Sequence, residues 1–538
     1  MSKPFELGIC MAGAVSAGAY TAGVMDFLIE ALQTWEDKKG EPGVPSHEVI
    51  IKALGGASAG GMTGIITAAA INNPIVPVTE ADSYDLFKNR PENKFYNAWV
   101  DLLHDDMFSL LLNTEDIEGP KVYSLFNSMF IDYVGKKSLQ VDESEFIQRK
   151  FVDENLKIFT TLTNLEGFKY NTDFVGEMTD NDYHLTHHAD YATFILNKKQ
   201  NQYNNDGWIP LNFFDNVNTD IALDAAMATG AFPVGLRSRR ITRAKKYVND
   251  LSWNKPLLEK FPIQEDPYEA LIIDGGTLNN EPFERVKSLI NGDDADKNKD
   301  ESTFEGTTLM IDPFPSYATG FDLETDDMTS IVGKTLSAML GHLRSKPEVL
   351  QSIFVENNVD QYQIAPVRYS NNQKIEGSKA IACGFMGGFG GFIHKEFRVH
   401  DFFLGRANCE HFLREYFTVE MDTKNPIFKK GYQGVAKDEF VSLKGKRQII
   451  PIFEPKKDQM YMPTFKSGTI WPKRREADIA QFNGGLKTRM GKIIMNLSDY
   501  NFGTRIFLGI GNRFILRRKL ANAVMDTIRT SMQKHDLI

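Results

Sequence analysis

The chain has 538 residues, of which 42% are hydrophobic and 25% charged, and this composition excludes a largely disordered chain or a multi-span membrane protein. The formal net charge of −10 gives no overall basic field, so no nucleic-acid partner is expected and any contact with anionic lipid must be local. Cys10, Cys383 and Cys409 are too few for a disulfide framework or a zinc site and are expected to be small core residues. They suit a reducing compartment, and a cytoplasmic location is predicted.

The N-terminal segment admits two interpretations. Leu7 to Met25 is an uncharged run of small and apolar residues, and Ala12-Gly13-Ala14 resembles a signal-peptidase site. Against a signal peptide or membrane anchor, Glu6 precedes the run, glycines interrupt it, and Asp26 and Glu30 follow with a helical period. The favoured interpretation is a strand at 5–10, a loop at 11–18 and a helix at 19–33.

A second strand–turn–helix unit follows, and two such units predict an α/β fold with a mainly parallel sheet. Its parts are a strand at 49–54, a turn at 55–58 and a helix at 60–71. Further strands are expected at 157–162, 269–273, 307–311, 361–366 and 448–453, with helices at 220–228, 328–345 and 516–533. The remaining predictions are a helical insertion at 83–137, a flexible surface loop at 291–301, a catalytic domain at 1–320, and a C-terminal extension at 321–538 packed on it.

The strongest chemical signal is Gly56-Ala57-Ser58-Ala59-Gly60, a nucleophile-elbow pattern. Glycines around the serine permit a strained turn, and the flanking strand and helix place Ser58 at a helix N-terminus whose partial charge favours an anion. The alternative is an ordinary tight turn. A serine nucleophile also needs a base and an oxyanion hole.

Asp274 is the candidate base. It ends the predicted strand Ile272-Ile273, and Gly275 and Gly276 follow, which lets another backbone approach. The alternative for this residue is a turn-forming Asp-Gly pair.

The candidate oxyanion hole is the first loop, Gly13-Ala14-Val15-Ser16-Ala17-Gly18, with Gly13, Ala14 and Val15 as its backbone donors. A dinucleotide fingerprint would need glycine at Val15, and a phosphate-binding loop would need Lys-Ser/Thr at Ala19-Tyr20. An ordinary turn is the remaining alternative.

These elements, in this order, resemble the patatin-like phospholipases. Asp274-Gly275-Gly276-Thr277-Leu278-Asn279-Asn280-Glu281-Pro282 and Ala228-Thr229-Gly230-Ala231-Phe232-Pro233 resemble further family segments, and the similarity covers about residues 5 to 315. The resemblance implies a three-layer α/β/α fold, a mixed C-terminal extension, and a Ser58–Asp274 dyad without histidine, metal or organic cofactor.

The first loop departs from the usual family pattern, because Ala17 stands where a basic residue is usual. A bacterial subgroup with a Gly-x-Val-Ser loop matches better than the plant enzymes.

The implied function is a serine lipid-acyl hydrolase of the phospholipase A or esterase type, acting through an acyl-enzyme on phospholipid or another acyl-ester lipid. The alternatives are an acyltransferase using the same dyad, and a catalytically weakened lipid-binding or protein-interaction module. The sequence does not specify the oligomeric state.

Two C-terminal features leave peripheral membrane contact open. The glycine–phenylalanine segment 384–392 is interpreted as tight turns whose aromatics fill the core, with a mobile lid as the alternative. The basic residues at 473–475, 513 and 517–519 are interpreted as solvated faces, with an interfacial helix as the alternative.

Overall fold

The computed structural model describes residues 3–80, 89–117, 119, 121–142, 144–173, 182–197, 202–292, 294, 297–315, 361–453, 461–497 and 516–538. The predicted helix at 328–345, Arg513 and the proposed boundary between 320 and 321 lie outside the described residues.

A nine-stranded sheet forms the centre of the molecule, with the order β5-β4-β3-β2-β1-β8-β9 and with β7 joining β3 to β6. Neighbours along β3-β2-β1-β8-β9 are parallel, while β4 and β7 run antiparallel to β3. The predicted, mainly parallel α/β sheet is therefore confirmed. The strands are β1 Phe5–Met11, β2 Val49–Gly56, β3 Val152–Asp173, β4 Asp182–Leu196, β5 Ile209–Leu211, β6 Arg239–Arg243, β7 Tyr268–Asp274, β8 Gly306–Ile311 and β9 Gln361–Ile364.

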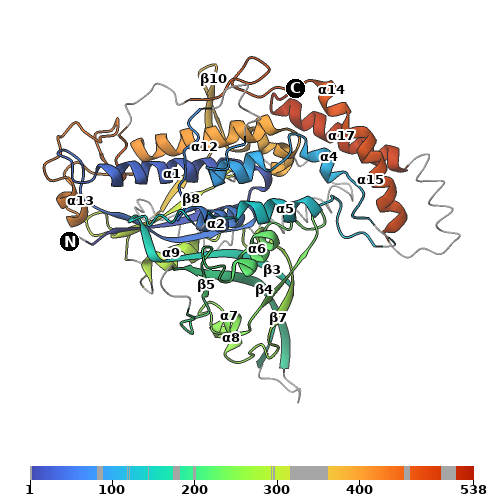
Figure 1. Ribbon diagram of the computed structural model, residues 1–538, viewed down its shortest axis with the longest axis horizontal. Coiled ribbons are helices and arrows are strands. Elements are labelled where there is room, and N and C mark those ends of the chain that lie inside the picture. Colours follow the sequence, from blue (N-terminus) through green and yellow to red (C-terminus); the bar gives the residue numbers. More distant parts are fainter. Residues whose placement is uncertain are drawn as a thin grey trace.

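Successive side chains along each strand point to opposite faces of the sheet, so both faces carry side chains to be buried. Helices cover both faces (Figure 1). On β1, Leu7, Ile9 and Met11 belong to the core under α1 (Gly18–Lys38), whereas Cys10 belongs to the core under α9 (Phe283–Asn291). Two further helices, α2 Ser58–Ala70 and α12 Lys395–Glu415, lie on the α1 side. The result is the expected three-layer arrangement.

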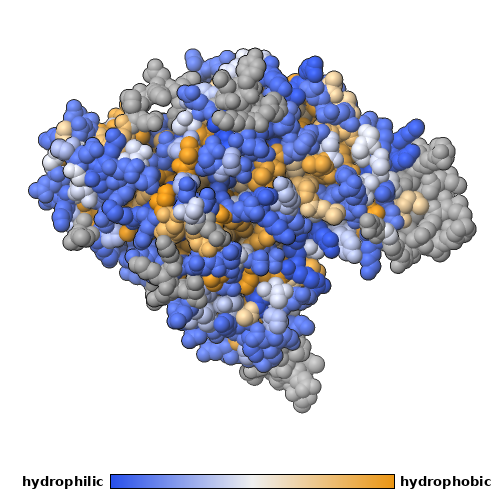
Figure 2. Space-filling model, in the orientation of Figure 1, coloured by the Kyte–Doolittle hydropathy of each residue, from blue (hydrophilic) through white to orange (hydrophobic). Residues whose placement is uncertain are grey.

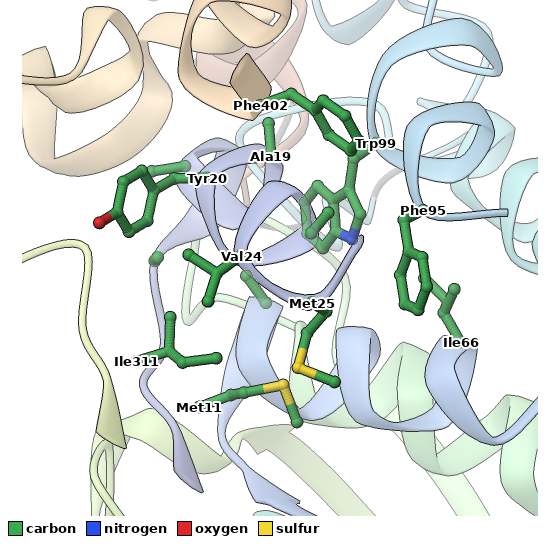
Figure 3. Packing of buried hydrophobic residues seen from close by; sticks show 14 of the residues in the cluster. Met11, Ala19, Tyr20, Val24, Met25, Ile66, Phe95, Trp99, Ile311 and Phe402 are labelled. Carbon is green, nitrogen blue, oxygen red and sulfur yellow. The ribbon is translucent and has the colours of Figure 1, made fainter. Parts of the chain in front are cut away.

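Helix α1 is enclosed by the rest of the protein, which explains the uncharged N-terminal run. Figure 3 shows Met11 and Ile311 of the sheet below it, Trp99 and Phe95 beside it, and Phe402 of α12 above it. By length and composition the helical stretch Val15–Lys38 could cross a membrane, yet 89% of its most apolar window is buried within the protein. The strand–loop–helix prediction for this segment is confirmed.

The described residues of the C-terminal part share the main hydrophobic core and form no separate cluster among themselves. Strand β9 extends the central sheet beside β8, and α12 packs along α1. The core cluster accordingly runs from Phe5 to Leu537. Division of the chain into domains at about residue 320 stays a prediction. The other elements of this part are the hairpin β10 Val367–Ser370 and β11 Gln373–Glu376, the pair β12 Thr418–Val419 and β13 Arg447–Gln448, and helices α13 Pro426–Gly431, α14 Glu476–Ala480, α15 Phe482–Asn496 and α17 Arg517–Lys534.

Several predicted elements differ from the structure. The predicted strand at 448–453 is wrong beyond Gln448, because Pro451 has no N–H and the buried run continues as irregular chain. The predicted loop at 291–301 is partly wrong, since Asn298 is fully buried and bonds the Asn291 side chain. Within the predicted insertion, the described residues form short pieces: α3 Lys94–Tyr96, a π-helical turn at Asn97–Asp101, α4 Met107–Leu111 and α5 Met129–Ser138.

Most of the described basic residues (Lys473, Arg475, Arg518 and Lys519) are exposed, as expected for solvated faces, whereas Arg474 is half-buried. Arg474 pairs with Glu396 and Lys473 with Asp536. Helix α17 turns Ala521, Met525, Ile528 and Met532 inward. On the face drawn in Figure 2, hydrophobic residues gather in the middle, over the α1 layer, and hydrophilic residues dominate the edges.

A substitution tests how closely α1 and α12 approach. A Cβ added at Gly23 would lie 1.9 Å from the Phe402 carbonyl oxygen, so Gly23→Ala must push the helices apart. We expect a loss of about 1–3 kcal/mol in the free energy of unfolding, from the midpoint of urea unfolding. The control is Gly484→Ala in α15, where nothing lies within 4 Å. That change should be neutral or stabilising by up to about 1 kcal/mol, and equal effects of the two variants would contradict the packing argument.

Candidate active site

Ser58 stands at a strained turn between β2 and α2. Its φ is +49°, a left-handed conformation that is costly for a residue with a Cβ. The turn is feasible because its glycines leave no side chain between backbones: a Cβ on Gly60 would lie 2.1 Å from the Met11 carbonyl oxygen, and one on Gly56 would lie 2.5 Å from the Gly60 carbonyl carbon. The chain thus presents Ser58 at the carboxyl end of the sheet and at the N-terminus of α2.

The Ser58 backbone N–H is held by a residue from another helix. It donates to Thr229 Oγ1 at 2.9 Å, and the Thr229 hydroxyl donates in turn to the Thr161 carbonyl oxygen at 2.8 Å. Thr229 ends α6 (Thr219–Thr229), within the segment that resembles the family. No local pattern indicates this role, because a threonine before a glycine is equally suited to an ordinary helix end.

The structure brings Ser58 and Asp274 into direct contact. Ser58 Oγ donates to Asp274 Oδ2 at 2.6 Å, with no histidine between them. The Ser58 residue is 6% exposed and the Asp274 residue 4% exposed. Such a short bond to a buried carboxylate is charge-assisted and can accept the serine proton.

Asp274 is fixed by the loop that follows β7. The Gly276 N–H donates to its Oδ1 at 2.7 Å, and the Thr163 hydroxyl donates to its carbonyl oxygen at 2.9 Å. A Cβ on Gly275 would lie 2.0 Å from the Thr161 carbonyl oxygen. The two glycines therefore let β7 close against β3 and orient the carboxylate.

The loop at 13–18 lies beside Ser58, but it differs from the prediction at Gly13. The Gly13 N–H donates to the Asn280 carbonyl oxygen at 3.2 Å, so it is not a free oxyanion donor. Instead, Gly13 gives room, since a Cβ there would lie 2.9 Å from Ser58 Cβ. The amides of Ala14 and Val15 have no hydrogen-bond partner among the described residues and remain the candidate donors.

A deep apolar cavity opens at Ser58. Its empty space, counted together with the open solvent at its entrance, is about 1020 Å³. Its wall is almost entirely hydrophobic, and it comes from α2, the helical pieces around 98–139, α6 and the segment after it, and the C-terminal part. The lining includes Val15, Met62, Ile66, Trp99, Phe130, Ile131, Val134, Leu223, Met227, Phe232, Leu236 and Phe392, with Arg237 and Arg239.

The histidines of the described residues take other roles, and none lines this cavity. Burial lowers the pKa of His47 to about 4, and its Nε2 donates to the Ile449 carbonyl oxygen at 2.8 Å as a neutral ring. Within the described part of the chain, no group of three or more His, Cys, Asp and Glu side chains could hold a metal ion.

Comparison with known proteins places this geometry in a family. A model described as patatin-like phospholipase matches residues 9–287, a little over half of the chain. The chain belongs to the patatin-like phospholipase family. This family is generally one of lipid acyl hydrolases, and the match includes both Ser58 and Asp274. This patatin-like chain is also similar to the uncharacterized protein y4iI of Sinorhizobium fredii, which is 31% identical over 492 residues, 80% of this chain and 67% of the relative.

The family match stops before some of the elements that complete this patatin-like site. Phe392 lines the cavity, and β8, β9 and α12 lie beyond residue 287. The alignment with the Sinorhizobium fredii protein is much longer than the family match.

Thr229 offers a test of how the elbow is held. Thr229→Val keeps the shape but leaves the buried Ser58 N–H and Thr161 C=O without their partner, so unfolding should become easier by about 1–3 kcal/mol. Thr229→Ser retains the hydroxyl and should recover most of that loss. Urea unfolding of both variants measures the free energy of unfolding. A valine variant as stable as the serine variant would contradict the role assigned to the hydroxyl.

Proposed function

We propose that the chain is a serine lipid-acyl hydrolase of the phospholipase A or esterase type, with Ser58 as nucleophile and Asp274 as general base. The observation that carries the proposal is the 2.6 Å bond between Ser58 Oγ and Asp274 Oδ2 where the apolar cavity begins. A Ser–Asp bond of the same length also occurs on the surface. Ser144 Oγ donates to Asp142 Oδ1 at 2.6 Å, but both residues are exposed and neither lines the cavity at Ser58.

The reaction follows from the positions of these groups. Ser58 Oγ attacks the ester carbonyl while its proton moves to Asp274, and the amides of Ala14 and Val15 bind the oxyanion. Collapse of the tetrahedral intermediate expels the alcohol, which takes the proton from Asp274. Asp274 then removes a proton from water, which attacks the acyl-enzyme and releases a fatty acid and free Ser58. An alcohol in place of this water would give acyl transfer.

The cavity wall supports a long acyl chain as the bound group. Met62, Ile66, Val134 and their neighbours offer no hydrogen bonds to a polar substrate, whereas burial of methylene groups gives about 0.8 kcal/mol each. The ester would then lie at Ser58 with its head group toward Arg237 and Arg239, the charged side chains of the cavity wall.

The dyad is tested by replacing Ser58 and Asp274, with the exposed pair Ser144 and Asp142 as the control. Ser58→Ala should abolish labelling by a fluorophosphonate probe and hydrolysis of a p-nitrophenyl ester. Asp274→Asn should lower kcat by about 10²–10⁴-fold, the usual contribution of a general base. Ser144→Ala and Asp142→Asn should leave both readouts unchanged. A wild-type protein inert to probe and ester would favour the lipid-binding or interaction module.

We also propose that the cavity mouth rests on lipid aggregates. The outer face of α5 exposes Met129 and Tyr133, each 61%, while Phe130, Ile131 and Val134 of the same helix line the cavity. The neighbouring segments add Tyr123, Leu125, Phe232 and Val234, of which Val234 is 72% exposed. The two segments are joined by the bond from the Leu125 N–H to the Val234 carbonyl oxygen at 2.8 Å. Exposed apolar side chains around a lipid cavity match an interfacial contact, and Lys136 and Lys137 end the same helix.

The contact can be measured with phospholipid vesicles. Replacing both Met129 and Tyr133 by serine should reduce vesicle co-sedimentation and hydrolysis of vesicle phospholipid at least fivefold, and affect a water-soluble ester much less. Leu443→Ser, at a side chain 79% exposed and absent from the cavity wall, is the matched control. Equal losses on vesicles and on the soluble ester would rule out a specific interfacial role.

A further inference from the structure

The loop at 13–18, which carries the candidate oxyanion donors, is strained at Val15. Val15 has φ +49°, and a β-branched residue in the left-handed region is unusual even in turns. Val15 also lines the cavity beside Ser58, so its conformation sets where the amide donors point. Strain of this kind persists only where the surroundings fix it.

The loop is held by the glycine–phenylalanine segment Ala382–Phe392 of the C-terminal part, which consists of two 3₁₀ turns separated by non-helical backbone at residues 385–388. The buried Ser16 hydroxyl donates to the Gly388 carbonyl oxygen and accepts from the Gly391 N–H at 2.8 Å. Both glycines are needed for this approach. A Cβ on Gly388 would lie 2.7 Å from the Ala14 carbonyl oxygen, and a Cβ on Gly391 would lie 2.6 Å from Ser16 Oγ.

The glycine–phenylalanine segment is itself held at both ends by α12. Asp401 accepts the N–H of Ala382 at 2.7 Å and the N–H of Cys383 at 2.8 Å. The fully buried Arg398 donates to the Gly391 carbonyl oxygen, and also to the carbonyl oxygens of Leu103 at 3.0 Å and His104 at 2.9 Å. Because Leu103 lines the cavity, one side chain of α12 ties the cavity wall to the segment that fastens the loop.

We propose that residues 382–401 belong to the catalytic machinery, with Ser16 as a positioning residue through which they hold the Ala14 and Val15 amides in the oxyanion-binding conformation. At Ala17, where the family loop usually carries a basic residue, this chain has a fully buried methyl group. The neighbouring Ser16 provides the anchor, and its partners lie 372 and 375 positions away in the sequence, outside the family match. The catalytic consequence rests on the proposed hydrolase function, while the fastening itself does not.

The test is Ser16→Ala in the full chain, with two readouts. Hydrogen–deuterium exchange should increase in peptides covering 12–18 and 382–392, while peptides of β2 and α9 keep their wild-type exchange. Ester kinetics should show kcat lowered at least tenfold with KM within twofold, because the oxyanion forms only in the transition state. Ser442→Ala, at another buried serine in a distant turn, is the control. If Ser16→Ala does not fold, Ser16→Cys, with a weaker donor of similar shape, takes its place and should give a smaller change in the same direction.

The outcomes separate the two proposals. An inert wild type overturns the hydrolase function, and exchange at 12–18 still decides whether Ser16 fastens the loop. Unchanged exchange in the Ser16 variant overturns the fastening. Faster exchange together with wild-type kcat overturns the assignment of Ser16 as a positioning residue. A general loss of protection across the sheet shows a purely structural role and also overturns it.

Discussion

The carboxyl ends of β1, β2 and β7 meet the middle of β3 so closely around Ser58 that side chains have no room between them. Gly60 touches the backbone after β1, Gly275 touches the backbone of β3, and Gly13 touches Ser58. This convergence forces the left-handed turn at Ser58 and brings Asp274 within hydrogen-bonding distance, so the chemistry depends on backbone packing more than on any single side chain. The helices then serve to keep the strands at this separation, and their burial explains why residues 1–70 are so rich in alanine and glycine.

What could be predicted from the sequence was what local patterns encode. The two strand–turn–helix units, the placement of Ser58 after β2 and that of Asp274 at the end of β7 all follow from short apolar runs ending at glycines. Strand β4 escaped prediction because its first half is polar and rich in histidine, and its support comes from pairing along much of β3. The run at 448–453 was predicted as a strand because it is apolar. Ile449 and Ile450 are indeed buried, but they lie in irregular chain of the C-terminal part.

The finer parts of the site depend on contacts between distant residues, which no local pattern records. The occupation of the Gly13 N–H by Asn280, the Thr229 hydroxyl under the elbow, and the Ser16 contacts each join segments separated by well over a hundred positions. Arg398 shows that such long-range contacts can require the burial of a charged side chain. Burial lowers the pKa of its guanidinium to about 10, which still leaves it charged at neutral pH, and backbone carbonyl oxygens of two segments accept its protons.

The order in which the chain is synthesised gives the fastening of the 13–18 loop a further consequence. A ribosome releases residues 1–315, with the serine and the aspartate, before it has made the segment at 382–401 that grips Ser16. Until then β8 also lacks its neighbour β9, and one edge of the sheet is open. A nascent chain can therefore form the elbow without a competent oxyanion loop. Under the proposed hydrolase function, the protein would stay inactive during translation until the segment at 382–401 has packed against the loop.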